Sequence, residues 1–324
     1  MLKVKFLYAA FVSFFQQIGI RSTANNIKML FTNLCLIFSK QPEPLYKKRH
    51  ELNRQFLKQS ITLPKDDVKS SPVENYRIWV LWWQGESQMP PIVRCTYNSI
   101  CKMTDKEVVL ITKDNWKSYI NPASWIEQKV LNGKMKLPAL SDYIRASLLY
   151  EYGGMWIDST VLCTKQIPSW IFEREFFSIH NDETSTNKYV ANGRWNVQIL
   201  GSNKKHLEVF HCLQHVFSEY WEKYDYIMDY LLVDYSIDYA YNEKQSVKNI
   251  IDSVPCTNQN MHAILSLFDK PFEQDIMNKL SENTWFFKLT YKHRFIESIN
   301  GRPTFFKYII DKYLITNALP NGIK

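Results

Sequence analysis

Two carboxylates and one arginine lie close together in a stretch that reads as a helix, a two-glycine stop and a strand. Asp142 and Arg145 are one helical turn apart, because the apolar residues around them recur at helical spacing. Gly153 and Gly154 end this predicted helix, and three apolar residues then lead to Asp158. Ligand chemistry in open α/β sheets gathers at the carboxyl ends of strands. We therefore expect Asp158 to meet a ligand there.

Aromatic and basic side chains elsewhere suit a ligand that carries a base and phosphates. Trp82, Trp83 and Gln84 end a predicted strand, where a nucleotide base could stack or be hydrogen-bonded. Adjacent residues of a strand face opposite sides, so we expect at least one of the two tryptophans in the core. Lys288 and Lys292 share one face on or just after a late predicted strand and could meet a diphosphate.

Further polar residues could complete such a site. His180 and Asn181 follow another predicted strand and could border an acceptor. Asp234 and Asp238 are four residues apart on a predicted aromatic-rich helix, where like charges disfavour each other unless a partner or a function compensates. Asp234 is the catalytic candidate of this pair, and Asp238 is expected on a solvated face. Paired carboxylates also serve glycoside hydrolysis, for which their separation in space would decide.

Several motifs together make the chain resemble a known family. They are Trp82-Trp83-Gln84-Gly85, Pro90-Pro91-Ile92-Val93, Ser141-Asp142-Tyr143-Ile144-Arg145, Tyr152-Gly153-Gly154-Met155-Trp156-Ile157-Asp158-Ser159-Thr160 and Phe287-Lys288-Leu289-Thr290-Tyr291-Lys292. With these motifs the chain resembles the capsular polysaccharide synthesis family of bacterial glycosyltransferases, relatives of the DXD sugar transferases. The resemblance runs from Ile78 to about Phe306, and its most specific part is the S-D-x-x-R and Y-G-G-x-x-x-D pair.

The resemblance implies an α/β fold of the GT-A-like, Rossmann-related kind, in which helices flank a nucleotide-sugar-binding sheet. It implies transfer of a sugar from a nucleotide-diphosphate sugar to a glycan or lipid-linked glycan, with retention of the anomeric configuration. A divalent metal ion, Mn²⁺ or Mg²⁺, would bridge Asp158 and the diphosphate. The family's D-x-D reads Asp158-Ser159-Thr160 here, so waters or another acid would have to complete the metal's oxygen ligands.

The resemblance and the residue patterns together give roles to the candidate residues. Asp142 and Arg145 would contact the donor sugar and its phosphates. The expected catalytic residues are Asp158, Asp142, Arg145 and Asp234. The expected donor-binding residues are Trp82, Trp83, Gln84, Asp142, Arg145, Gly154, Lys288 and Lys292, with His180 and Asn181 on the acceptor side.

These assignments have plainer structural alternatives. Asp158 could cap a turn at the end of its strand. Asp142 and Arg145 could form an ion pair that only supports their helix. Lys288 and Lys292 could lie on a solvated sheet edge. Two other functions also fit the sequence. The missing D-x-D carboxylate suggests a non-catalytic assembly subunit, and a related chemistry would move a sugar phosphate rather than a sugar.

Composition narrows the class of protein. The chain has 324 residues, 45% of them hydrophobic and 15% aromatic, which suffices for a sizeable core. The whole net charge of +8 falls on residues 1–60, which hold ten Lys and Arg and two Glu. A nucleic-acid enzyme normally has its basic patch on the folded domain, so we expect no nucleic-acid partner and instead an anionic membrane surface. Six scattered cysteines suggest reduced thiols in the cytoplasm.

The chain divides into three predicted parts. Residues 1–40 form a helical N-terminal extension with apolar stripes, which we expect to lie on the inner face of the cell membrane. Docking onto the protein's own core or a partner, or a single-pass anchor, are the alternatives. Residues 41–75 are a connector that contains a charged helix, and residues 76–324 are the GT-A-like catalytic domain. Strands are expected at 78–83, 107–112, 155–157, 176–179, 197–201 and 285–289, and helices at 90–102, 207–220, 226–241, 245–253 and 304–313.

Overall fold

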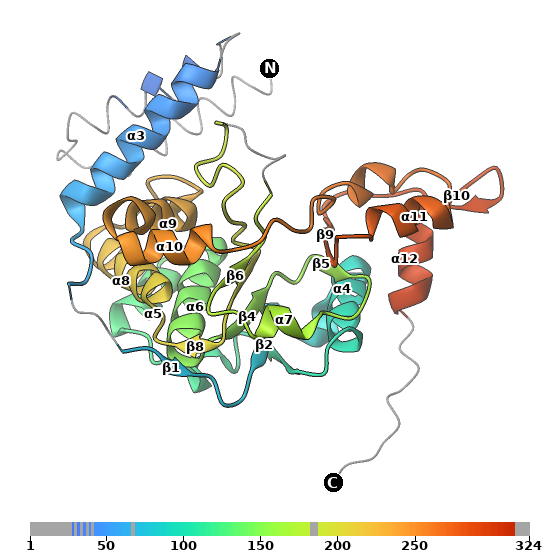
Figure 1. Cartoon of the computed structure of the whole chain (residues 1–324), viewed down its shortest axis with the longest axis horizontal. Helices are drawn as coiled ribbons and strands as arrows, with labels where there is room; N and C mark the ends of the chain where they lie inside the picture. The colour runs from blue at the N-terminus through green and yellow to red at the C-terminus, as the bar shows by residue number, and fades with distance from the viewer. Residues whose placement is uncertain are drawn as a thin grey trace.

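A mixed sheet forms the centre of the molecule (Figure 1). The computed structural model describes residues 42–65, 69–181 and 187–314, together with positions 28, 31, 32, 35, 36 and 39. The sheet has the order β3-β2-β4-β7-β6, with β2 parallel to β3 and β4, and β7 antiparallel to β4 and β6. The strands are β3 (Glu107–Ile111), β2 (Arg77–Leu81), β4 (Gly154–Ile157), β7 (Ile199–Ser202) and β6 (Phe177–Ser178). Helices flank this sheet, so the predicted α/β class is confirmed.

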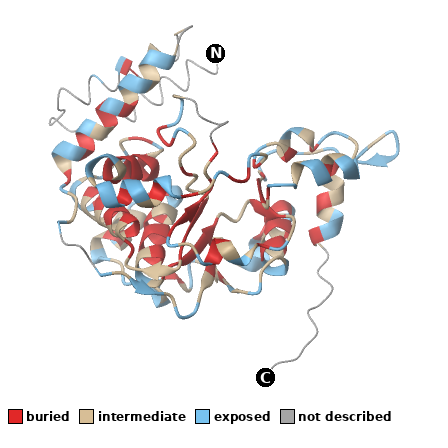
Figure 2. Ribbon diagram, viewed as in Figure 1, coloured by how far each residue is buried: buried red, intermediate tan, exposed pale blue. Residues whose placement is uncertain are grey.

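The strands form where short apolar runs are covered on both faces. All four residues of β4 are buried, as a strand in the middle of an α/β sheet requires. Successive side chains point to opposite faces. Trp79 and Trp156 therefore belong to one core cluster, whereas Ile78 and Met155 belong to a second one on the other face. Figure 2 shows this buried centre in red.

Two groups of helices cover the sheet (Figure 1). One group joins the first core cluster: α5 (Ser124–Leu131), α6 (Leu137–Tyr152), α8 (Glu208–Lys223), α9 (Leu232–Glu243) and α10 (Gln245–Asp252). The other side holds α4 (Pro91–Lys102) and α7 (Ser169–Phe172), and α12 (Phe305–Leu314) packs on α4 rather than on the sheet. Helix α9 begins only at Leu232, not at the expected position 226, and the other predicted elements occur within about three residues of their expected bounds.

The two glycines between α6 and β4 are required by the tight passage from helix to sheet. Gly153 and Gly154 have φ angles of 63° and 81°, which residues with a side chain rarely adopt. A Cβ atom on Gly154 would lie 2.4 Å from the carbonyl oxygen of Arg77, in the neighbouring strand. The glycines thus let α6 turn directly into β4, which sets the distance between Arg145 and Asp158.

The C-terminal part of the chain forms a lobe beside the sheet (Figure 1). Strand β5 (Val161–Cys163) pairs antiparallel with β9 (Phe286–Lys288), and α12 packs on α4 through a third core cluster. The remaining elements of the lobe are α11 (Gln274–Leu280), β10 (Ser298–Ile299) and β11 (Arg302–Pro303). On the opposite side of the molecule, β1 (Ser71–Pro72) pairs with β8 (Lys204–Lys205). The β5–β9 pair brings late residues of the chain beside the end of β4.

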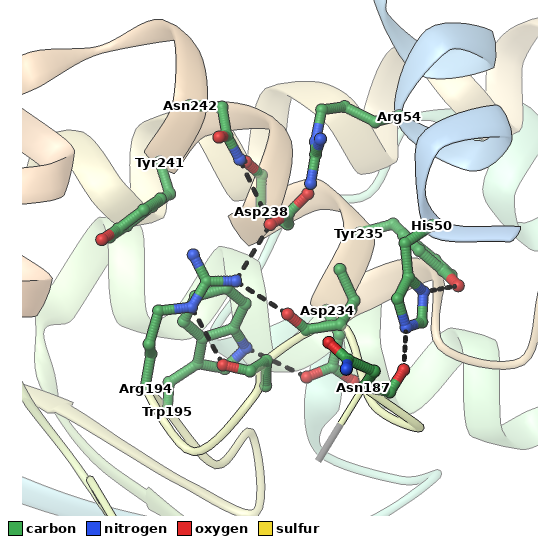
Figure 3. Close-up of polar contacts among 12 residues, drawn as sticks. His50, Arg54, Asn187, Arg194, Trp195, Asp234, Tyr235, Asp238, Tyr241 and Asn242 are labelled. Carbon is green, nitrogen blue, oxygen red and sulfur yellow. Dashed lines mark hydrogen bonds and ion pairs between the residues drawn. The ribbon is translucent and has the colours of Figure 1, made fainter. Parts of the chain in front are cut away.

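Helix α3 (Glu43–Ser60) belongs to the folded domain, although its residues were expected to form a connector. Its Phe56 and Leu57 are part of the main core cluster. Arg54 also donates from Nε to Asp238 of α9 at 2.7 Å, and Arg194 reaches the other oxygen of this carboxylate at 3.1 Å (Figure 3). Asp238 is fully buried, so its expected place on a solvated face is wrong. The residue is instead an anchor for α3.

We expect Asp238→Asn to lower the free energy of unfolding by about 3 kcal/mol, because two arginines would lose their buried counter-charge. The matched control is Glu243→Gln, which removes an ion pair between the same two helices. Lys58 and Glu243 are 60% and 32% exposed, so this loss should stay under about 1 kcal/mol. Urea unfolding measures both variants. Equal losses of unfolding free energy in the two variants would show that the burial of Asp238 does not strengthen its ion pairs.

Two expectations concern the surroundings of the domain. Among the described residues, no helix has the length and apolar character needed to cross a bilayer. Nearly all of the predicted interfacial extension, residues 1–40, lies outside the described residues. None of the six cysteines is joined to another in the structure, and their reduced state stays a prediction.

Candidate active site

A large cavity opens at the carboxyl ends of β2 and β4. Its volume is about 1000 Å³, at the upper end of the range for small-molecule sites. Many of the predicted site residues line it, although they come from distant parts of the sequence. These are Trp82, Trp83, Gln84, Asp142, Arg145, Asp158, Asn181, Asp234, Lys288 and Lys292.

Asp158 lies on the wall of this cavity directly after β4, and both of its carboxylate oxygens are engaged. Oδ1 accepts hydrogen bonds from Arg145 Nη2 at 3.1 Å and Trp156 Nε1 at 2.9 Å. Oδ2 accepts one from Lys288 Nζ at 3.0 Å. Burial alone would raise the pKa of this carboxyl, but the charges of Lys288 and Arg145 outweigh it and lower the pKa below its ordinary value. Asp158 is therefore ionised and holds two cations.

Arg145 and Asp142 come from the middle of α6, which is buried on almost every side. Their side chains are only 6% and 15% exposed, which excludes an exposed surface ion pair. Arg145 lies 3.3 Å from Asp142 and stacks over the Trp156 ring at 4.8 Å. Its Nη1 is the atom that pairs with Asp142, and its Nε is buried without a hydrogen-bond partner among the described residues. A buried guanidinium held between two carboxylates keeps a fixed positive charge at the cavity wall, which suits an anionic ligand.

Asp234 brings a third carboxylate to the same wall, from α9 (Figure 3). Trp195 Nε1 donates to its Oδ1 at 3.0 Å. Burial is the main cause that raises the pKa of Asp234 to about 6 and that of Asp142 to about 7. Both groups therefore change charge near neutral pH, whereas Asp158 stays ionised.

Lys288 reaches the site because β9 pairs with β5. The register sets Lys288 opposite Val161, one residue after Thr160. Its Nζ donates to Thr160 Oγ1 at 2.7 Å as well as to Asp158. A residue 130 positions later in the chain thereby contacts the strand-end carboxylate. Lys292 lines the outer part of the cavity and is exposed.

Aromatic rings form another side of the cavity. Trp82 and Trp83 follow β2 and are both half-buried, and Trp83 packs against the main core cluster, as one of the two was expected to. The Trp82 ring meets Tyr291 edge-on at 5.5 Å, and Trp83 packs against Trp116 at 6.0 Å. The fully buried tryptophan of β2 itself is Trp79. Two partly open indoles beside a polar strand end suit the stacking of a planar base.

The family model described as capsular polysaccharide synthesis protein matches residues 35–309. The chain belongs to this family. The match begins before α3, so it also covers the whole segment that was expected to be a connector, residues 41–75. No curated protein matches the chain.

One similar solved structure is described as the apo structure of the WbbM bifunctional glycosyltransferase. The identity is 8% and the TM-score 0.39, with 80% of this chain and 51% of that chain covered. The chain thus spans about half the length of that structure.

In this member of the capsular polysaccharide synthesis family, two predicted site residues, Gly154 and His180, do not line the cavity. Gly154 is buried in β4 against β2, where it serves close packing rather than donor contact. His180 shares a hydrogen bond between its Nδ1 and the carbonyl of Val254 at 2.9 Å, outside the lining residues. Its neighbour Asn181 does line the cavity.

The structure adds residues to the site that the sequence pattern did not indicate. Gln198 has a buried Oε1 without a hydrogen-bond partner among the described residues, and it lines the cavity. His262 lies near Lys288, and burial together with this charge lowers its pKa, which keeps the ring neutral. Tyr189 and Tyr230 are 51% and 76% exposed at the rim. All four residues lie in turns or bends, where no periodic sequence pattern marks a residue as part of a site.

The residues present do not fit a divalent metal ion. Such an ion is coordinated by six or more oxygen atoms, several of them from carboxylates or water. Among the described residues, no three Asp, Glu, His or Cys side chains are grouped so that they could hold a metal. Both oxygens of Asp158 already contact cationic or N–H donors. The Mn²⁺ or Mg²⁺ ion expected from the resemblance therefore has no ready set of ligands among the described residues.

The raised pKa of Asp142 gives a prediction about stability and pH. A carboxyl that binds its proton more tightly when folded favours the folded state at low pH. This contribution is lost as the pH rises from about 4 to about 7, by up to about 1 kcal/mol per pH unit. Asp142→Asn removes this dependence, so the variant should gain stability relative to the native chain over that range. Melting temperatures at several pH values measure the difference, and a constant difference would contradict the shift.

Proposed function

We propose that the chain transfers a sugar from a nucleotide-diphosphate sugar to a growing surface glycan, of the capsular or lipopolysaccharide kind. One observation carries the proposal. Arg145 and Lys288, from α6 and β9, converge on Asp158 at the wall of a cavity of about 1000 Å³. Membership of the capsular polysaccharide synthesis family supports the class of acceptor.

The two cations suit the diphosphate of the donor. Charge builds on this leaving group as the bond to the sugar breaks, and fixed cations lower the energy of that state. Asp158 holds Arg145 and Lys288 beside each other, so little reorganisation is needed when the donor binds. Trp82 and Trp83 offer faces for the base, at the end of the neighbouring strand.

Asp142 and Asp234 suit the hydroxyl groups of the sugars. A carboxyl can accept a hydrogen bond from a hydroxyl when ionised and donate one when protonated. Both have pKa values near neutral, so either form is accessible. Asn181 and the exposed rings of Tyr189 and Tyr230 lie where an acceptor glycan could enter.

The transfer exchanges one bond at the anomeric carbon. The bond from this carbon to the diphosphate oxygen breaks, and its electron pair leaves with the diphosphate. The acceptor hydroxyl forms the new bond on the same face and gives its proton to the leaving phosphate. Retention follows from this same-face course, as the family resemblance implies. The anomeric coupling constant of the product tests retention, and an inverted product would contradict it.

Donor binding is the first test of the proposed function. Thermal unfolding of the full chain is followed with a panel of UDP-, GDP- and other nucleotide-diphosphate sugars. A donor at a hundred times its dissociation constant should add about 2.7 kcal/mol to the free energy of unfolding. Free monosaccharides are the control and should add nothing. Equal, negligible effects of all donors would contradict the proposed function.

We also propose that residues 1–40 hold the enzyme on the anionic inner surface of the membrane. The basic residues and apolar stripes of this segment support this proposal. The full chain should bind vesicles with anionic lipids more tightly than neutral vesicles, and salt should weaken this binding. Equal binding to both kinds of vesicle in low salt would count against it.

A further inference from the structure

The Lys288 ammonium lies between Asp158 and Thr160, in the position that a cation bridging these two side chains would take. Its Nζ lies 3.0 Å from Asp158 Oδ2 and 2.7 Å from Thr160 Oγ1. The β5–β9 pairing fixes this position, because Lys288 is in register with Val161. The side chain is 22% exposed and lines the cavity, so one side of the ammonium faces the ligand space.

The surrounding groups favour an ammonium over a metal ion. Thr160 offers a neutral hydroxyl, which is a good hydrogen-bond acceptor for Lys but a weak metal ligand. Arg145 engages the other oxygen of Asp158, and Trp156 shares it. A divalent ion at this carboxylate would lie close to both cations, and the neighbouring carboxylate of Asp142 is already paired with Arg145.

We propose that the Lys288 ammonium, with Arg145, neutralises the leaving diphosphate, so that sugar transfer needs no divalent metal ion. This inference rests on the proposed function. In the step itself, the anomeric C–O bond breaks toward the diphosphate, and Lys288 meets the charge that appears on its terminal phosphate. The acceptor oxygen forms the new bond, and its proton leaves with the phosphate. No co-reactant beyond donor and acceptor is needed.

The first test compares transfer by the full chain in EDTA and in Mn²⁺, over a panel of nucleotide-diphosphate sugars. The rate in EDTA should lie within about twofold of the rate in Mn²⁺. Lys288→Met should lower the rate roughly a hundredfold, and Mn²⁺ should not restore it. Lys288→Arg keeps the charge and should retain more activity than Lys288→Met. Lys279→Met, at an exposed lysine of the same lobe, is the matched control and should behave like the native chain.

The second test reads binding instead of activity. Calorimetry with UDP and GDP should give dissociation constants that EDTA does not change and that Lys288→Met raises about tenfold or more. Mn²⁺ alone should show no stoichiometric binding to the native chain. Metal binding that Asp158→Asn removes would overturn the inference.

The possible outcomes distinguish a failure of the role of Lys288 from a failure of the proposed sugar transfer. Transfer that stops in EDTA and returns with Mn²⁺ would overturn the role of Lys288 and leave the proposed function intact. Native rates in Lys288→Met would do the same. A chain that transfers no sugar and binds no nucleotide in either condition would contradict the proposed function and the inference together.

Discussion

Asp158→Asn is expected to lower the rate of sugar transfer by roughly a hundredfold to a thousandfold. The reason is geometric as well as electrostatic. Asp158 receives Arg145 at one oxygen and Lys288 at the other, so its charge holds both cations at the cavity wall. A neutral amide would release the lysine and place an N–H group against one of the two donors. Steady-state transfer kinetics measure the loss.

A matched control separates this effect from a general effect of the substitution. Asp275→Asn changes an exposed aspartate of α11 and should leave transfer unchanged. Asp158→Asn should also lower the melting temperature, since two partly buried cations lose their partner. The assay is therefore run well below that temperature. Near-native turnover of folded Asp158→Asn would remove Asp158 from the catalytic machinery.

The second large effect is expected for Arg145 and Asp142 as a unit. Arg145→Met removes one of the cations that offset the carboxylates of Asp142, Asp158 and Asp234 at the cavity wall. The variant should therefore lower the transfer rate more than a hundredfold. Asp142→Asn should cut it more than tenfold. The double variant should lose little more than Arg145→Met alone, because groups that act together lose most of their effect at the first substitution. A double-mutant cycle on kcat/KM measures this coupling.

The chain offers a control pair with the same spacing. Lys48 and Glu51 form an i,i+3 ion pair on α3, but their side chains are 53% and 51% exposed. Lys48→Met and Glu51→Gln should leave transfer unchanged and alter the free energy of unfolding by less than about 1 kcal/mol. If Arg145→Met unfolds the chain, Arg145→Lys keeps the charge but loses the two-pronged geometry, and should still reduce transfer. Additive, small losses would show that the pair only supports its helix.

The sequence predicted best those parts of the site that depend on local spacing. Asp142, Arg145 and Asp158 lie within one helix–turn–strand unit. Helical periodicity, two glycines and a short apolar run suffice to place them together. The strands β2, β3 and β4 were predictable for the same reason, because buried parallel strands are continuous apolar runs.

Contacts between distant segments could not be predicted in this way. Asp238 was expected on the surface because helical periodicity shows no sign of a partner 184 residues earlier, in α3. The contact of Lys288 with Asp158 depends on the β5–β9 register, which no local pattern specifies. Gly154 was misassigned because a glycine needed for close backbone approach looks the same in sequence as one that faces a ligand.

We expect a sugar, without its phosphate, to move from a nucleotide-diphosphate donor. The most direct measurement incubates the full chain with a donor and a glycan acceptor and identifies the nucleotide that is released. We predict a nucleoside diphosphate, formed in step with the glycosylated acceptor and almost absent for Asp158→Asn. Release of a nucleoside monophosphate would show sugar-phosphate transfer instead, and an unchanged donor under all conditions would show a chain without this activity.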